Sequence, residues 1–309
     1  YASFYHNYKG RRYRHDQVHN LFGYYMTRSA SEAFERYVPE KRILLFSRAS
    51  YIGMHRFGGI WQGDNASWWS HLKMNVKMMP SLNMCGFLYT GADVGGFGAD
   101  ATEDLVLRWL EFAVFTPLLR NHSARGTRRQ EVYRFSHVEK FADVIGVRYQ
   151  ILPYIYSEYM KAALQNTMMF NPLAFLYGED TLAGQVEGQL FIGENIMVAP
   201  VCEQNVSGRV VYFPEHMKEL IFKNGIIEEG KVYEKGFSYV EMQMGTVHIF
   251  LREGYLFPVA KGGKCVEDVD FEDLTLYSFG KEIKPYEYYL DDGETKDFNM
   301  ETHIRILSC

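Results

Sequence analysis

Two aspartates stand where apolar runs break into polar, glycine-rich sequence. Asp64 lies in Trp-Gln-Gly-Asp-Asn at 61–65, and Asp93 lies in Thr-Gly-Ala-Asp-Val-Gly-Gly-Phe at 90–97. The glycines beside both acids let a ligand approach the backbone closely. Each acid also has a plainer interpretation. Asp64 or Asn65 could cap the helix that follows, and Asp93 could simply form a turn.

A cation, a histidine and two aromatic rings accompany these acids. Arg48 could clamp hydroxyl groups or pair with a surface acid, and His122 could donate to a hydroxyl or serve only a structural role. Trp61 and Phe97 offer flat faces on which a sugar ring can stack. A glycosidic bond is hydrolysed by one protonated and one ionised carboxyl group. Without a phosphate-binding loop or a Ser-His-Asp arrangement, these residues therefore favour sugar chemistry.

The composition excludes several other classes. A formal net charge of −5 argues against a nucleic-acid or anionic-membrane partner. The four cysteines lack Cys-x-x-Cys spacing, so we expect no metal site and no cofactor, and we expect free, buried thiols at Cys85 and Cys202. No apolar run approaches the length of a membrane span. Cytoplasmic localisation is the default expectation.

The elements that must position these residues alternate between strand and helix. Short apolar strands precede Arg48, Asp93 and His122. Residues 1–17 are expected to form a loop, and apolar spacing predicts a helix over 18–37. Further helices are expected over 67–79, ended by Pro80, after Thr102, and from a Ser136-x-x-Glu139 capping box. About four such alternations predict the C-terminal half of a (β/α)8 barrel.

After about residue 180 the pattern changes to short strands separated by Gly, Asn and Asp turns. This texture predicts β-sandwich domains. We therefore expect an α/β plus all-β chain of three units. They are the half-barrel at 1–180, a proximal β-sandwich at 181–259 and a distal β domain at 260–309.

Several of these segments resemble glycoside hydrolase family 31, the α-glucosidase family. The segments that carry the resemblance are FSRAS at 46–50, WQGDN at 61–65, YTGADVGGF at 89–97, FTPLLRNHS at 115–123, GENIMVAPV at 193–201 and YLDDGETKDF at 289–298. The chain looks closest to gut-bacterial α-glucosidases of that family. The resemblance implies a retaining exo-α-glucosidase that removes terminal glucose from an α-linked oligosaccharide.

The resemblance also implies a role for each site residue. Asp64 falls on the family's general acid/base position. Arg48, Asp93 and His122 fall on positions that hydrogen-bond the sugar hydroxyls, and Trp61 and Phe97 fall on the aromatic wall of the pocket.

The family's nucleophile motif, Trp-x-Asp-Met-Asn-Glu, does not occur in this sequence. We therefore expect the nucleophilic Asp and the first half of the barrel to lie on an upstream segment of the same protein or on another chain. Two alternatives stay open: an α-xylosidase on the same scaffold, or a catalytically incomplete fragment that only binds carbohydrate.

Overall fold

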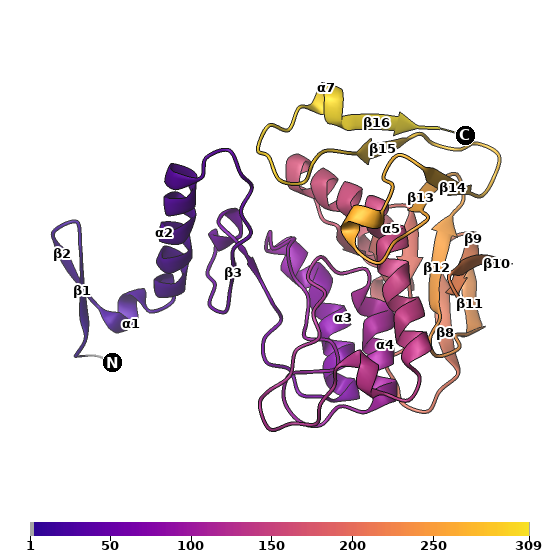
Figure 1. The fold of residues 1–309 in the computed structure, drawn as a ribbon, viewed down its shortest axis with the longest axis horizontal. Helices are drawn as coiled ribbons and strands as arrows, with labels where there is room; N and C mark the ends of the chain where they lie inside the picture. The colour runs from indigo at the N-terminus through magenta and orange to yellow at the C-terminus, as the bar shows by residue number, and fades with distance from the viewer. Residues whose placement is uncertain (1–2, 309) are drawn as a thin grey trace.

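The structure, a computed structural model, describes residues 3–308, and its first elements form an arm beside the main body (Figure 1). The arm contains β1 (Tyr5–Tyr8), β2 (Arg11–Arg14), α1 (His15–Val18) and α2 (Leu21–Tyr37). The expected loop over residues 1–17 is wrong for the described part, because β1 and β2 pair as an antiparallel hairpin. Lys9 and Gly10 close its two-residue turn with φ angles of 48° and 75°, which suit the twist of paired strands.

Four parallel strand segments come next, each hydrogen-bonded to its neighbour. β3 (Phe46–Ser47) pairs with β4 (Gly59–Ile60). The backbone N–H of Gln62 then donates to Gly91 O at 2.8 Å, and a parallel bridge joins Asp93 to Arg120. The predicted half-barrel is confirmed by this order and by the α-helices that follow the second, third and fourth segments. Since the carboxyl ends of parallel strands meet at one edge, the polar residues that follow them gather there.

The helices of the half-barrel are α3 (Trp69–Met84), α4 (Glu103–Ala113) and α5 (Val138–Gln165). Pro80 does not end α3 as the sequence predicted, because the helix continues through it to Met84. Pro80 is buried, and the packing of this face offsets the one backbone hydrogen bond that proline removes. Gly86, with a φ of 86°, follows the end of the helix instead.

The start of α5 also differs from the prediction. Ser136 and Glu139 form no capping box, and α5 begins one residue after His137. The backbone N–H groups of Ser136 and His137 donate instead to the Glu103 carboxylate, at 3.2 and 2.7 Å. A carboxylate from the first turn of α4 thus binds the Ser136 N–H group that Glu139 would accept in a capping box. Residues distant in sequence outcompeted the local motif.

The rest of the chain is mostly antiparallel sheet. A six-stranded sheet has the order β10-β9-β12-β7-β6-β5, and three two-stranded sheets pair β11 with β8, β13 with β14, and β15 with β16. The strands are β5 (Phe170–Pro172), β6 (Leu190–Ile192), β7 (Ile196–Val198), β8 (Gly208–Phe213), β9 (Met217–Lys223), β10 (Ile226–Tyr233), β11 (Gly236–Glu241), β12 (Val247–Arg252), β13 (Leu256–Ala260), β14 (Leu274–Ser278), β15 (Tyr286–Tyr289) and β16 (Ile304–Leu307). The remaining short helices are α6 (Leu173–Leu176) and α7 (Met300–His303), and single 3-10 turns lie at Met54–Arg56, Val132–Arg134, Ala183–Gln185 and Val266–Asp268.

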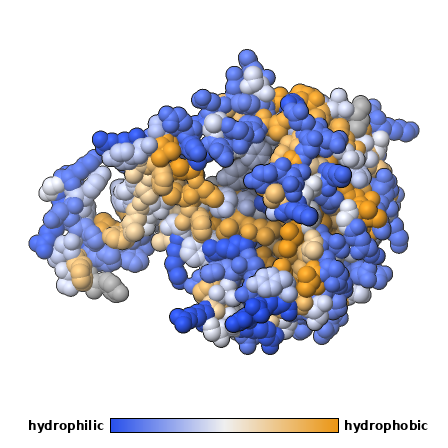
Figure 2. Space-filling model, viewed as in Figure 1, coloured by the Kyte–Doolittle hydropathy of each residue, from blue (hydrophilic) through white to orange (hydrophobic). Residues whose placement is uncertain are grey.

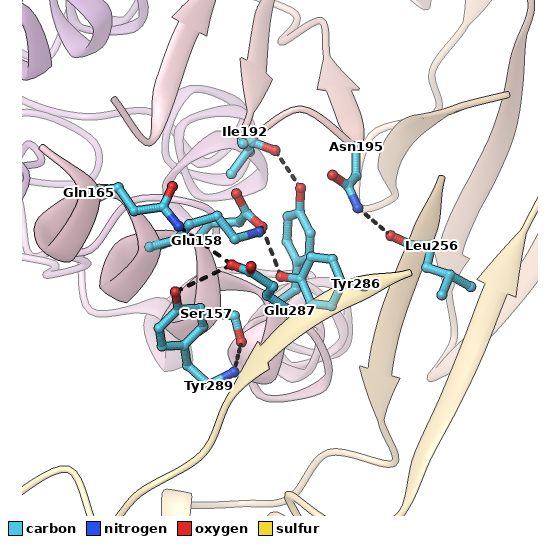
Figure 3. A network of polar contacts seen from close by, with 12 residues as sticks. Ser157, Glu158, Gln165, Ile192, Asn195, Leu256, Tyr286, Glu287 and Tyr289 are labelled. Carbon is cyan, nitrogen blue, oxygen red and sulfur yellow. Dashed lines mark hydrogen bonds and ion pairs between the residues drawn. The ribbon is translucent and has the colours of Figure 1, made fainter. Parts of the chain in front are cut away.

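A buried polar network attaches the distal strands to α5 (Figure 3). Glu158, whose side chain is 4% exposed, accepts hydrogen bonds from Tyr286 Oη and Lys161 Nζ, both at 2.8 Å. The backbone N–H of Tyr289 donates to Ser157 Oγ at 3.1 Å. Buried polar groups satisfied in this way fix one relative placement of the two elements. The long helix α5 thus fixes the position of the distal strands relative to the half-barrel.

Large apolar side chains are exposed on α2 and in the segment that leads into β3. Figure 2 shows apolar residues gathered where the arm meets the body. Leu44 and Phe46 are 58% and 42% exposed, and Phe22 and Met26 of α2 are 54% and 62% exposed. Contiguous apolar surface of this kind marks a face that another part of a protein covers.

Candidate active site

Asp64 lies in the loop after β4 and pairs with Arg48 from the end of β3. Arg48 Nη2 donates to Asp64 Oδ2 at 3.1 Å, and the two side chains are 75% and 34% exposed. Neither Asp64 nor Asn65 caps α3, because the helix begins at Trp69 and no side chain caps it. Asn65 instead donates from Nδ2 to the backbone of its own loop, at Gln62 O. The capping interpretation is therefore wrong, and Asp64 presents its carboxylate at the strand ends.

Asp93 lies at the next strand end and is fully buried. Arg120 Nε donates to its Oδ1 at 2.7 Å, whereas Oδ2 is buried without a hydrogen-bond partner among the described residues. Burial raises the pKa of Asp93, and the Arg120 guanidinium opposes that rise. Its side chain thus contacts Arg120 rather than the turn backbone, so a turn-forming role does not account for it. Oδ2 is therefore an unsatisfied hydrogen-bond acceptor among the described residues, which a donor from a bound ligand could satisfy.

Two pairs of aromatic rings accompany the Asp93–Arg120 pair. Trp61 and Phe46 meet edge to face with centroids 6.1 Å apart, and the Arg120 guanidinium lies 5.7 and 5.6 Å from their rings. Trp61 Nε1 is a second buried polar atom without a partner in the described chain. In the two loops that follow, the rings of Phe97 and His122 lie 5.2 Å apart. Since His122 is exposed, it is no core histidine.

The turn that follows Asp93 joins the loops of the site. The backbone N–H groups of Phe97 and Gly98 donate to Asn65 O at 2.7 and 2.9 Å, and Ala124 N donates to Phe97 O at 2.8 Å. A Cβ on Gly96 would stand 2.6 Å from Ser67 N, and its φ of 89° strains any other residue. The spacing of glycines seen in the sequence thus reflects close approach between the loops that carry Asp64 and Asp93.

All six predicted site residues therefore come from the ends of the four parallel segments. The charges of His122 and Asp64 both act on the pKa of Asp93, so these three groups share one electrostatic environment. A groove of about 660 Å³ is lined by Phe46 and Ser47 of β3, by Arg48 and by residues of α1 and α2. The predicted roles of the six residues in binding and catalysis stay predictions.

The prediction omitted two residues that belong to this constellation. Arg120 donates to Asp93 and lies over the Trp61 ring, and Phe46 is the second ring near the same guanidinium. Both occur in the motif segments, at 115–123 and 46–50. What could have identified Arg120 is the parallel register, because a cation opposite a buried acid on the next strand is its natural partner.

Possible metal ligands and free thiols can be located among the described residues. No group of three or more His, Cys, Asp or Glu side chains there could hold a metal ion. Cys85, Cys202 and Cys265 are free thiols. Cys85 is exposed, contrary to the expectation that it is buried, because it lies just beyond the last turn of α3. No helix among the described residues combines the length and apolarity needed to cross a bilayer.

The comparison with protein families gives the class to which this fold and site belong. The model of the glycosyl hydrolases family 31 TIM-barrel domain matches residues 2–158, and that of the family 31 C-terminal domain matches residues 166–257. The first match covers half of the chain, so the chain belongs to glycoside hydrolase family 31. The predicted unit boundaries at 180 and 259 stay predictions.

Similar proteins and solved structures support this family membership. The chain is 29% identical to alpha-glucosidase 2 of Bacillus thermoamyloliquefaciens over 297 residues, which are 94% of this chain and 37% of that protein. It is 28% identical to human neutral alpha-glucosidase AB, over 96% of this chain and 31% of that protein. A mutant of a family 31 dextranase from Flavobacterium johnsoniae, complexed with isomaltotriose, superposes with a TM-score of 0.82 at 26% identity, covering 92% of this chain and 36% of the other. The chain thus spans about a third of the length of these relatives.

Proposed function

We propose that this chain supplies the acid/base half of the active site of a retaining exo-α-glucosidase. One observation carries the proposal: four consecutive parallel strand ends bring Arg48, Asp64 and the Asp93–Arg120 pair to one edge. In this proposal Arg48, Asp93 and His122 hydrogen-bond the hydroxyls of a terminal glucose, while Trp61 and Phe97 flank its ring. The free Oδ2 of Asp93 and Nε1 of Trp61 match an acceptor and a donor for such hydroxyls.

Asp64 acts as the general acid and then as the general base. In the first step it donates its proton to the glycosidic oxygen while the nucleophilic carboxylate bonds to the anomeric carbon and the C–O bond to the leaving group breaks. In the second step Asp64 takes a proton from water, whose oxygen displaces the carboxylate and releases glucose. The exposure of Asp64 at the strand ends suits both transfers, because the leaving group and the water must reach it.

Asp93 is not the nucleophile in this scheme. It is fully buried and paired with Arg120, and a nucleophile must approach the anomeric carbon from the face opposite the acid. We propose that the nucleophilic Asp lies outside this chain, on the missing half of the barrel, whether upstream in the same protein or on another chain. The groove beside Arg48 and the exposed apolar faces of β3 and α2 leave room for that half.

The test supplies this chain in trans with the first half of the barrel of alpha-glucosidase 2 from Bacillus thermoamyloliquefaciens. We expect hydrolysis of 4-nitrophenyl α-glucoside, with the α-anomer released first by NMR, and a loss of about a thousandfold or more in the Asp64→Asn variant. The matched control is Asp100→Asn, an exposed acid of the same region. Sugar binding without hydrolysis would instead support a fragment that only binds carbohydrate. A preference for the α-xyloside over the α-glucoside would instead support an α-xylosidase. Cytoplasmic localisation also stays a proposal, which rests on the free thiols.

A further inference from the structure

The buried side chain of Gln130 connects two of the loops that carry the site. Gln130 lies ahead of the Val132–Arg134 turn and is 1% exposed. Its Nε2 donates to Val94 O at 3.1 Å and to Gly96 O at 3.0 Å, both in the turn after Asp93. The same nitrogen lies 3.4 Å from His122 O, in the neighbouring loop. One amide group therefore contacts both segments.

The turn after Asp93 depends on this amide for its carbonyl groups. Gly95 and Gly96 have φ angles of 86° and 89°, so no regular ladder continues through them. Buried carbonyl groups that lack a donor cost free energy. Since Gln130 Nε2 satisfies the carbonyls of residues 94 and 96, it fixes the turn between Asp93 and Phe97.

A second contact ties Gln130 to the loop of His122. Asn121 Nδ2 donates to the Gln130 backbone carbonyl at 2.8 Å. With the His122 contact, this closes a loop of hydrogen bonds around residues 121–130. The Phe97 and His122 rings, 5.2 Å apart, lie on the two segments so joined.

We propose that Gln130 is a positioning residue of the sugar site, which sets the distance between the Asp93 turn and the His122 loop. This inference rests on the proposed function, because it concerns how that site grips a sugar. Gln130 acts through its neighbours, and it needs no contact with the sugar. Small displacements of groups that bind a ligand reduce affinity strongly, which makes such a clamp consequential.

Another buried glutamine provides a matched control. Gln189 is 2% exposed, and its side chain exchanges two hydrogen bonds of 2.8 Å with the backbone of Tyr212 in the sandwich. Replacing it removes a comparable number of buried hydrogen bonds far from the strand ends. A purely structural role for Gln130 predicts that both glutamines behave alike.

The experiment measures binding of isomaltotriose and of maltotriose to the 309-residue chain by titration calorimetry. The variants are Gln130→Glu, which keeps the shape but replaces the donor with an acceptor, Gln130→Met and Gln189→Met. Thermal unfolding of each variant is followed in parallel. We expect both Gln130 variants to bind at least about tenfold more weakly. Gln189→Met should bind both sugars within about twofold of wild type, although its unfolding temperature should fall as much as that of the Gln130 variants.

A double-mutant cycle then separates positioning from general loosening. If Gln130 acts through the Asp93 turn, Gln130→Glu should add little to the loss already caused by Asp93→Asn, so the two effects fall short of their product. Independent, multiplicative losses would overturn the inference, as would Gln130 variants that bind like wild type. A Gln130 variant that fails to fold while Gln189→Met folds would also overturn it, because the role is then global. The titrations are repeated with the first half of the barrel supplied in trans as above, and a wild-type assembly that binds neither sugar removes the proposed function as well.

Discussion

Glu111 of α4 offers a sharp test of how the half-barrel is joined to the sandwich. Its Oε2 accepts from Arg108 Nη1 at 2.8 Å and its Oε1 accepts from Gly245 N at 2.7 Å. Arg108 Nη2 donates onward to Met242 O at 2.9 Å. The side chains of Arg108 and Glu111 are only 2% and 10% exposed. Two charges thus bridge the helix and the β11–β12 loop in a nearly dry contact.

Burial raises the pKa of Glu111 from 4.5 to about 7, and the Arg108 guanidinium and the Gly245 N–H limit that rise. The folded state therefore binds the proton more tightly than the unfolded state does. Between pH 4.5 and about pH 7, folding takes up protons, so the free energy of unfolding falls as the pH rises. A shift of this size corresponds to about 3 kcal/mol across that interval.

The perturbation is Glu111→Gln, which keeps the shape and cannot titrate. Urea unfolding of the wild type and the variant between pH 4 and 8.5 gives the difference in the free energy of unfolding at each pH. We expect this difference, wild type minus variant, to fall by about 3 kcal/mol from the acidic to the alkaline end. The control is Glu131→Gln, because Glu131 pairs with Arg134 at 3.4 Å with side chains about half exposed. Its difference should stay within about 0.5 kcal/mol at every pH. A Glu111→Gln difference that is flat across the range refutes the argument.

Three further outcomes follow from single contacts. Gly96→Ala should lower the free energy of unfolding by about 2 kcal/mol or more in urea, since its φ of 89° and the 2.6 Å approach to Ser67 N forbid a Cβ. Gly98→Ala, whose Cβ would meet only Asn65 O at 4.0 Å, should cost less than about 0.5 kcal/mol, and equal costs would contradict the geometry. Tyr286→Phe should cost about 1–3 kcal/mol because Glu158 loses a buried donor, whereas Tyr133→Phe, at a side chain 65% exposed, should be neutral. A disulfide reagent at pH 8 should modify exposed Cys85 promptly in the native chain. Partly exposed Cys202, whose pKa burial raises to about 11, should react much more slowly than Cys85 until the chain unfolds, as mass spectrometry of the digest can show.

The sequence predicted the half-barrel because its strand signals are local. Apolar runs that end in Arg48, Asp64 and Asp93 combine hydrophobicity with glycine turns, and both properties are visible without tertiary contacts. The failures occur where distant groups compete with a local signal. Pro80 stays inside a helix because its face is buried, and Glu103 accepts from the Ser136 N–H group that Glu139 would have bound in a capping box.

The candidate site was predictable as a set of residues but not as a set of contacts. No local rule pairs Asp93 with Arg120, 27 positions away, or aims the Gln130 amide at the carbonyls of residues 94 and 96. The same is true of the plainer interpretations. Capping by Asp64 is reasonable from spacing, and only the start of α3 excludes it. The exposure of His122 shows that it is not a core histidine, and its role stays a prediction.

The links to the β domains bear on the site through the two helices that make them. Glu111 ties α4 to the proximal sandwich, and Glu158 ties α5 to the distal strands. Those helices flank the segment that carries Arg120 and His122, because α4 precedes it and α5 follows it in the chain. We therefore expect that loosening either contact moves the Arg120 segment relative to β3 and β4, which would weaken sugar binding before Asp64 itself is displaced.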